Sequence, residues 1–127
     1  MLIDSKVLDA LSEEARTNPR LRKNLDLRDA EDDQSQRMLN ALEPGTMMNV
    51  HRHAETSETV VVLRGSIMEN YYDEQGNKTD SFLLKANSDI VGVSVPKGQW
   101  HNQECLESGT VILSVKNGKY EAVGKDK

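Results

Sequence analysis

The chain has 127 residues, a length that fits one domain with a single modest core. Its formal net charge of −5 argues against a nucleic-acid partner, because phosphate contacts need clustered lysine and arginine. No segment approaches the roughly 18 apolar residues of a membrane span, and no secretory signal opens the chain, so we expect a soluble cytoplasmic protein without a membrane partner.

The N-terminal segment predicts one helix, which Asp4 or Ser5 can cap. Its apolar positions recur at helical spacing and are Val7, Leu8, Leu11 and Ala15. Asn18-Pro19 ends the helix, and residues 20–35 are charged without a clear period. We therefore assign residues 1–35 to an N-terminal helix and a charged connecting segment, and residues 36–123 to a β-barrel domain.

From residue 36 onward, short β-forming runs alternate with turn residues. The expected strands are 38–42, 47–53, 58–64, 66–73, 78–85, 90–95, 99–105, 110–116 and 120–123. The run 58–64 is apolar on both faces, which indicates a central strand. These strands predict an all-β fold, a small jelly-roll barrel with the N-terminal helix packed outside.

All three histidines of the chain fall in two short stretches. In a strand, His51 and His53 point to the same side. Glu58 follows after four residues and can return beside them, while His101 would come from another strand. Three imidazoles and a carboxylate suit one divalent transition metal ion, which can be Fe, Mn, Ni, Co, Cu or Zn. The spacing therefore predicts a metal site with these four ligands.

Four further side chains are candidates for lining the pocket. Alternation places Gln103 on the face of His101, where it can donate to a substrate oxygen or to the outer side of a ligand. Arg37 is the candidate pocket cation. Tyr71 and Tyr72 occupy opposite faces of one strand, so one of them looks inward.

Other residues near the motifs have more ordinary interpretations. Arg20, Arg22 and Lys23 can reach an anionic substrate, but such clusters are more often solvated surface. Arg52 lies between two ligands and should face away from the metal. Cys105 is the single cysteine, which agrees with a reducing compartment, and we expect it to be a small buried residue.

The two histidine stretches resemble the paired motifs of the cupin superfamily. The first, from Gly45 to Gly65, fits G-x5-H-x-H-x4-E-x6-G at every fixed position, and the second, from Pro96 to His101, keeps P-x-G-x2-H. The second stretch departs from the family pattern at Ile90, where a glycine is expected, and at Cys105, where an asparagine is expected. Neither departure removes a ligand, so the resemblance also implies a metal-binding cupin barrel.

A narrower resemblance covers most of the chain. The runs 19–24, 36–46, 51–53 and 61–65 look like the WbuC family of cupin-fold metalloproteins. WbuC-like genes are associated with bacterial surface-polysaccharide clusters. Cupin barrels commonly pair through their sheet edges, so the resemblance also implies a homodimer.

The leading functional prediction is a metal-dependent enzyme that acts on a small polar molecule. The resemblance suggests a sugar or sugar nucleotide in surface-polysaccharide biosynthesis, and a divalent ion can stabilise the enediolate that an isomerase forms. Three alternatives remain open: an Fe(II) dioxygenase, a non-catalytic metal-bearing module that binds a ligand, and a metal-free epimerase with a histidine base. Apart from the ligands, no residue stands out as catalytic.

Overall fold

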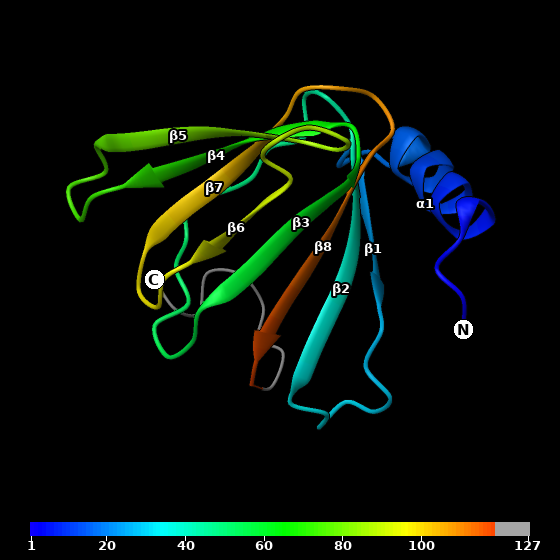
Figure 1. The fold of residues 1–127 in the computed structure, drawn as a ribbon, viewed down its shortest axis with the longest axis horizontal. Helices are drawn as coiled ribbons and strands as arrows, with labels where there is room; N and C mark the ends of the chain where they lie inside the picture. The colour runs from blue at the N-terminus through cyan, green and yellow to red at the C-terminus, as the bar shows by residue number, and fades with distance from the viewer. Residues whose placement is uncertain (119–127) are drawn as a thin grey trace.

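The structure is a computed structural model, and it describes residues 1–118. This part of the chain forms one helix and eight strands, arranged in two antiparallel sheets (Figure 1). The elements are α1 (Ser5–Thr17), β1 (Arg22–Asp26), β2 (Ser35–Leu42), β3 (Glu58–Arg64), β4 (Ser66–Tyr72), β5 (Lys78–Lys85), β6 (Gly92–Val95), β7 (Trp100–Cys105) and β8 (Thr110–Asn117). The predicted all-β jelly roll with one outer helix is confirmed, and the expected strand 120–123 lies outside the described residues.

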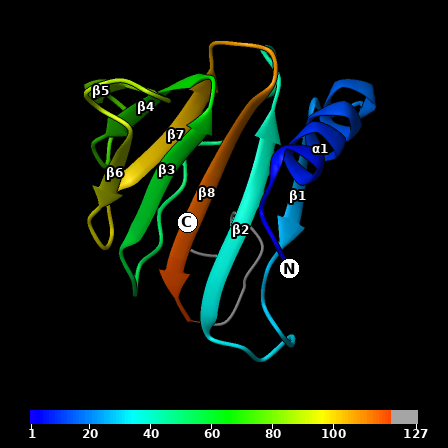
Figure 2. The same cartoon turned by 45° about the vertical axis from the view of Figure 1, so that its right-hand side comes forward.

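The strand order is β1-β2-β8-β3-β6 in the larger sheet and β5-β4-β7 in the smaller one (Figure 2). Strand β3 pairs with β8 on one side and β6 on the other, as expected for a central strand. Among residues 1–118 neither sheet closes on itself, so the expected barrel takes the form of two facing open sheets.

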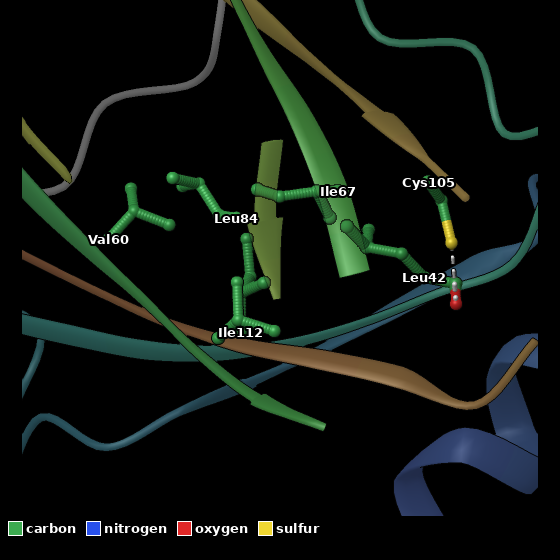
Figure 3. Close-up of a cluster of buried hydrophobic side chains, with 7 residues drawn as sticks. Leu42, Val60, Ile67, Leu84, Cys105 and Ile112 are labelled. Atoms are coloured by element: carbon green, nitrogen blue, oxygen red, sulfur yellow. Dashed lines mark hydrogen bonds between the residues drawn. The ribbon is translucent and has the colours of Figure 1, made fainter. Parts of the chain in front are cut away.

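The main apolar core lies between the two sheets (Figure 3). Its buried members come from six strands and are Leu42, Val60, Val62, Ile67, Leu84, Cys105 and Ile112. Cys105 is a small buried core residue, as predicted, and its thiol donates to the carbonyl oxygen of Leu42 at 3.4 Å. On β3, the buried Val60 and Val62 alternate in step with the buried Glu58, so the apolar core continues directly into the polar site.

Helix α1 covers the outer face of the larger sheet. Leu11 and Ala15 of the helix pack on Leu39, Ala41 and Val111 of β2 and β8. These strand residues alternate with the residues that face the smaller sheet, so β2 and β8 are buried on both sides.

The ends of α1 follow from its flanking residues. The Asp4 carboxylate accepts a hydrogen bond from the backbone N–H of Val7 at 3.1 Å and so caps the first turn. Asn18 ends the helix in an extended conformation, directly before Pro19.

Strand β1 was not expected. It contains one apolar residue, Leu25, in a charged run, so no alternation marks it in the sequence. It pairs only with β2 and forms an edge of the larger sheet, where polar side chains are tolerated. Part of the N-terminal segment 1–35 is therefore built into the sheet.

The expected strand 47–53 is wrong, since only His51 forms a β-bridge there, with His101. The neighbouring carbonyl groups bind side chains instead of a strand. Arg22 donates to the Met47 carbonyl at 2.6 Å, and the Asn102 amide donates to the Met48 carbonyl at 3.1 Å. These contacts hold the segment beside β7 without a continuous ladder.

Candidate metal centre

The three histidines converge between the sheets. One donor nitrogen from each of His51, His53 and His101 lies within 4.8 Å of the other two. The ring centroids of His51 and His101 are 4.6 Å apart, and those of His51 and His53 are 5.1 Å apart. The folded chain thus brings together residues that are fifty positions apart in the sequence.

Backbone pairing fixes this arrangement. The N–H of His51 donates to the carbonyl oxygen of His101 at 2.9 Å, and the reciprocal bond is 2.8 Å. The carbonyl of His53 accepts from the N–H of Gly98 at 2.9 Å. Gly98 has φ of +81°, a conformation that suits glycine in the turn before β7. This turn therefore links the two histidine stretches directly.

Glu58 on β3 reaches the same place from the larger sheet. Its Oε1 lies 3.5 Å from Nε2 of His101 and 3.8 Å from Nε2 of His53. Oε1 of Glu58 and Nε2 of His101 are both buried without a hydrogen-bond partner. Buried polar atoms are almost always paired, so two such atoms facing each other fit a site for a cation. The four predicted ligands are together.

The buried side of His101 is held by a carboxylate. Oε2 of Glu69 lies 2.6 Å from Nδ1 of His101, and Gln103 donates to Oε1 of Glu69 at 3.1 Å. A carboxylate accepts the Nδ1 proton, which leaves Nε2 with its lone pair toward the other histidines. Gln103 thus lies behind a candidate ligand, in one of the two roles expected for it.

His51 is held in the same tautomer by the main chain. Its Nδ1 donates to the carbonyl oxygen of Asn49 at 3.0 Å. The pKa of His51 is lowered to about 4, mainly by burial and also by the nearby His101 and His53, against the opposing effects of the Asn49 hydrogen bond and Glu58. His51 is therefore neutral near pH 7, the state in which imidazole binds a metal.

Glu58 is kept ionised by its neighbours. Burial acts to raise the pKa of Glu58, but Lys116, His101 and the Ser114 hydroxyl together outweigh it, and the pKa is lowered. Ser114 donates a short hydrogen bond to Oε2 of Glu58. Nζ of Lys116 lies 3.3 Å from Nε2 of His53, so an ammonium group borders the candidate site.

These side chains enclose a small cavity of about 140 Å³. Its polar lining comes from both sheets, from the histidine segment and from the edge strand β1, and comprises Asn24, Gln36, Asn40, His51, His53, Glu58, His101, Gln103, Ser114 and Lys116. Met38, Met48 and Ile112 complete it. A cavity of this size admits only a small group of a larger molecule.

The remaining predicted pocket residues lie elsewhere. Arg37 sits on β2 between the cavity-lining Gln36 and Met38, and its guanidinium pairs with Asp33 at 3.2 Å. Alternation along β2 therefore turns it to the face opposite the cavity. Arg52 also faces away, as predicted, and its guanidinium carbon lies 5.0 Å from the Trp100 ring centroid.

The two tyrosines are on opposite faces of β4, as expected. Tyr71 pairs in register with His101, but its ring packs against Phe82, with centroids 5.2 Å apart. It lines a separate apolar hollow of about 590 Å³ beside β5 and β6. The Tyr72 hydroxyl donates to Oδ1 of Asn102 at 3.1 Å. Neither side chain lines the histidine cavity.

Sequence reasoning missed Glu69, Ser114 and Lys116. Glu69 has no exposed surface, and alternation from the apolar Ile67 on the same strand was the available signal that it points inward. The last strand carries a similar signal, since Ser114 and Lys116 continue the face of a buried isoleucine.

The comparisons with known proteins place this geometry in a fold. The capsular polysaccharide assembling protein CapF from Staphylococcus aureus is similar with a TM-score of 0.65 and 19% identity, over 77% of this chain and 27% of the CapF chain. KdgF from Halomonas sp. is similar with a TM-score of 0.64 and 11% identity, over 83% of this chain and 84% of KdgF.

A recombinant oxalate oxidase in complex with glycolate is also similar, with a TM-score of 0.64 and 19% identity, over 84% of this chain and 56% of that one. At these identities the likeness shows the fold, which is that of the cupins. This chain spans only about a quarter of the CapF chain. The comparison with curated proteins gives no match.

One family model matches, and it covers residues 3–84. It is described as a domain of unknown function, DUF6016, while the narrower resemblance to WbuC proteins stays a prediction. In the described residues 1–118, no helix is both long and apolar enough to cross a membrane. The match spans more than half of the chain, so this cupin-fold protein belongs to the DUF6016 family.

Proposed function

We propose that this protein is a metal-dependent cupin enzyme that binds one divalent transition metal ion through His51, His53, Glu58 and His101. The proposed substrate is a small polar molecule, and the predicted class is a sugar or sugar nucleotide of surface-polysaccharide biosynthesis.

The observation that carries the proposal is the pair of buried, unpaired atoms at the centre of the cavity. Nε2 of His101 and Oε1 of Glu58 are 3.5 Å apart, and neither atom has a hydrogen-bond partner. Each lone pair would be an orphan in a metal-free protein, at an energetic cost of roughly 1–3 kcal/mol. A divalent cation satisfies both at once, together with the lone pairs of the other two imidazoles.

The surroundings support a catalytic role better than a structural one. A bound ion would supply a Lewis acid to an oxygen atom of the substrate. Around it, Asn24, Asn40 and Gln36 offer amide groups that can orient hydroxyl groups. Lys116 is the candidate for stabilising a developing negative charge. Met38, Met48 and Ile112 add an apolar side to the cavity.

Two alternatives use the same ligands. The same three histidines and carboxylate fit an Fe(II) dioxygenase equally well, and oxygen consumption distinguishes it. A non-catalytic module would bind a ligand tightly without turnover. The outer carboxylate at Glu69 fixes a histidine for metal binding in all three cases, so it does not separate them.

The first test is metal content. The protein is purified without a metal-binding tag, and metals per chain are measured by elemental mass spectrometry for the wild type, His101→Ala and Glu104→Gln. Glu104 is exposed on the same strand, so its variant is the matched control. We expect near-stoichiometric metal in the wild type and the control, and loss in His101→Ala. A wild type that stays empty after reconstitution with each candidate ion would refute the proposal.

The ion then directs the activity assay. Iron leads to oxygen-uptake measurements with candidate polar substrates, and zinc, nickel or manganese leads to sugar-isomerisation screens. Homodimerisation, which the family resemblance implies, is tested by light scattering coupled to size-exclusion chromatography.

A further inference from the structure

A second hollow lies directly beside the histidine cavity. It measures about 520 Å³ and shares four lining residues with that cavity, namely Asn24, Asn40, Met48 and His51. His51 therefore forms part of both walls. A molecule with one end at the metal centre can extend into this larger hollow, which we call the basic groove.

The charge of the basic groove is opposite to that of the protein as a whole. Arg20, Arg22 and Lys23 line it, and no acidic residue does, although the chain carries a net charge of −5. None of the ion pairs within residues 1–118 involves these three cations. The basic side chains are therefore available to an anionic ligand.

Among the three cations, Arg22 is held in place by a hydrogen bond to the main chain. Its guanidinium donates to the carbonyl oxygen of Met47 at 2.6 Å, which fixes it beside the segment that leads to His51. Burial lowers the pKa of Arg22, and the nearby charge of Arg20 lowers it further. Two cations that line one hollow without an acidic residue beside them gain from an anion placed across them.

We propose that the basic groove binds an oxyanion, a phosphate or carboxylate group, on the same molecule that reaches the metal centre. Guanidinium groups donate two parallel hydrogen bonds to such groups, and the amides of Asn40 and Asn49 add neutral donors. The substrate is thereby narrowed to a polar molecule with hydroxyl or carbonyl oxygens at one end and an anionic group at the other. This inference rests on the proposed function for its metal-bound end only.

The test compares glucose, glucuronate and glucose 6-phosphate, which differ only at carbon 6, by isothermal titration calorimetry with metal-loaded protein. Inorganic phosphate is titrated as a fourth probe. The variant is Arg20→Gln/Lys23→Gln, because both side chains are exposed and can be replaced without releasing the Met47 carbonyl from Arg22. Arg16→Gln/Lys78→Gln removes the same charge outside the groove.

We expect at least one charged sugar to bind about tenfold or more tightly than glucose, as charge-assisted hydrogen bonds allow. The preference should shrink several-fold in the groove variant, where only Arg22 remains of the three cations, persist in the control, and weaken at high salt. Which charged sugar is preferred separates a phosphate site from a carboxylate site.

Three results would overturn the proposed anion site: no binding of phosphate or of either charged sugar, no preference over glucose, or a preference that is undiminished in the groove variant. Metal analysis of the same samples keeps the two proposals apart. A preference that depends on Arg20 and Lys23 in a protein that takes up no metal would support the groove and refute the metal centre.

Discussion

The carboxylate of Glu69 lies 2.6 Å from Nδ1 of His101, and both side chains are closed off from solvent. Glu69 comes from β4 and His101 from β7, two neighbouring strands of the smaller sheet. Gln103 donates to the other oxygen of the same carboxylate. The orientation of one candidate ligand is therefore set by residues that do not touch the metal position themselves.

Glu69→Gln should weaken metal binding while leaving all four ligands in place. A glutamine offers one acceptor and one donor where the carboxylate offers two acceptors, so the negative charge behind His101 is lost and Gln103 keeps a partner only if its own amide turns over. We expect the metal affinity to fall about 10- to 100-fold, the usual effect of removing such an outer contact. Competition with a chelator measures it, Glu104→Gln is the control, and equal affinities would show that Glu69 does not position His101.

Lys116→Met should have the opposite effect on the metal. The Lys116 ammonium lies 3.3 Å from Nε2 of His53, where its positive charge repels a divalent ion. Methionine keeps much of the side-chain volume and removes the charge, so we expect metal affinity to rise several-fold. The same chelator competition measures it. A fall in affinity would mean that Lys116 supports the site by holding Glu58.

Gly65→Ala should destabilise the protein strongly. Gly65 has φ of +76°, and a Cβ there would lie 2.1 Å from the Thr110 hydroxyl oxygen and 2.9 Å from the Thr110 Cα. Gly76 has φ of +86° with no atom within 4 Å of such a Cβ, so Gly76→Ala isolates the conformational cost of roughly 1 kcal/mol. We expect Gly65→Ala to cost about 1–3 kcal/mol more. Urea unfolding measures both, and equal losses would contradict the predicted clash.

Leu39→Ala tests whether the helix stabilises the sheet. Leu39 on β2 is completely buried beneath α1. Its replacement by alanine should therefore lower the free energy of unfolding by about 2–5 kcal/mol. Leu83 on β5 is half exposed, and Leu83→Ala should change it by no more than about 0.5 kcal/mol. Chemical denaturation of the two variants gives the comparison, and a small loss for Leu39→Ala would mean that the helix packs loosely.

The Cys105 thiol should be alkylated slowly near pH 7, and its alkylation should accelerate only at higher pH. Burial raises its pKa, against the opposing hydrogen bonds from Thr110 and the Glu107 backbone. The thiolate is the nucleophile, so alkylation by iodoacetamide should lag behind that of a free thiol and accelerate only at higher pH. Because the pKa of Cys105 is raised by folding, the buried neutral thiol contributes fully to the free energy of unfolding below the unfolded pKa of about 8.5. This contribution is lost as the pH rises through the folded pKa.

Mass spectrometry of alkylation across pH 7–10 tests this behaviour. The same protein in urea is the control, since the exposed thiol there should titrate normally. Equal rates in the folded and unfolded protein would show that Cys105 is not shielded by the core.

Much of the strand pattern followed from the sequence because its cause is local. The run 58–64 combines β-branched residues with turn signals on both sides, and β3 has those same limits. Strand β5 also matches its predicted range, 78–85, although most of its side chains are exposed. Where the strand and turn signals coincide, propensity alone locates the element.

The elements that were missed depend on distant partners. Strand β1 exists because its backbone pairs with β2, and nothing in its charged sequence encodes that pairing. The segment 47–53 has strand propensity but gives its carbonyl groups to Arg22 and Asn102. The spacing of apolar residues in the sequence reveals neither the pairing of β1 nor the side-chain contacts of residues 47–53.

The candidate site shows the same division. His51, His53 and Glu58 were identified by their spacing, since they are close in sequence, and His101 by its fit to a second motif. Glu69 became apparent only when strand pairing placed β4 next to β7. Arg37 points away from the cavity because side chains alternate along β2, and its neighbours Gln36 and Met38 face the other sheet. The sequence alone does not tell which face of β2 meets that sheet.

The four candidate ligands are divided between the sheets, with Glu58 on the larger and His101 on the smaller. The family match over residues 3–84 includes the first three ligands and Glu69, but it stops before β7. Membership of the family therefore guarantees neither the fourth ligand nor the metal. For any other member, the diagnostic position is the residue that pairs with the counterpart of Tyr71 on the neighbouring strand, because a histidine there completes the set.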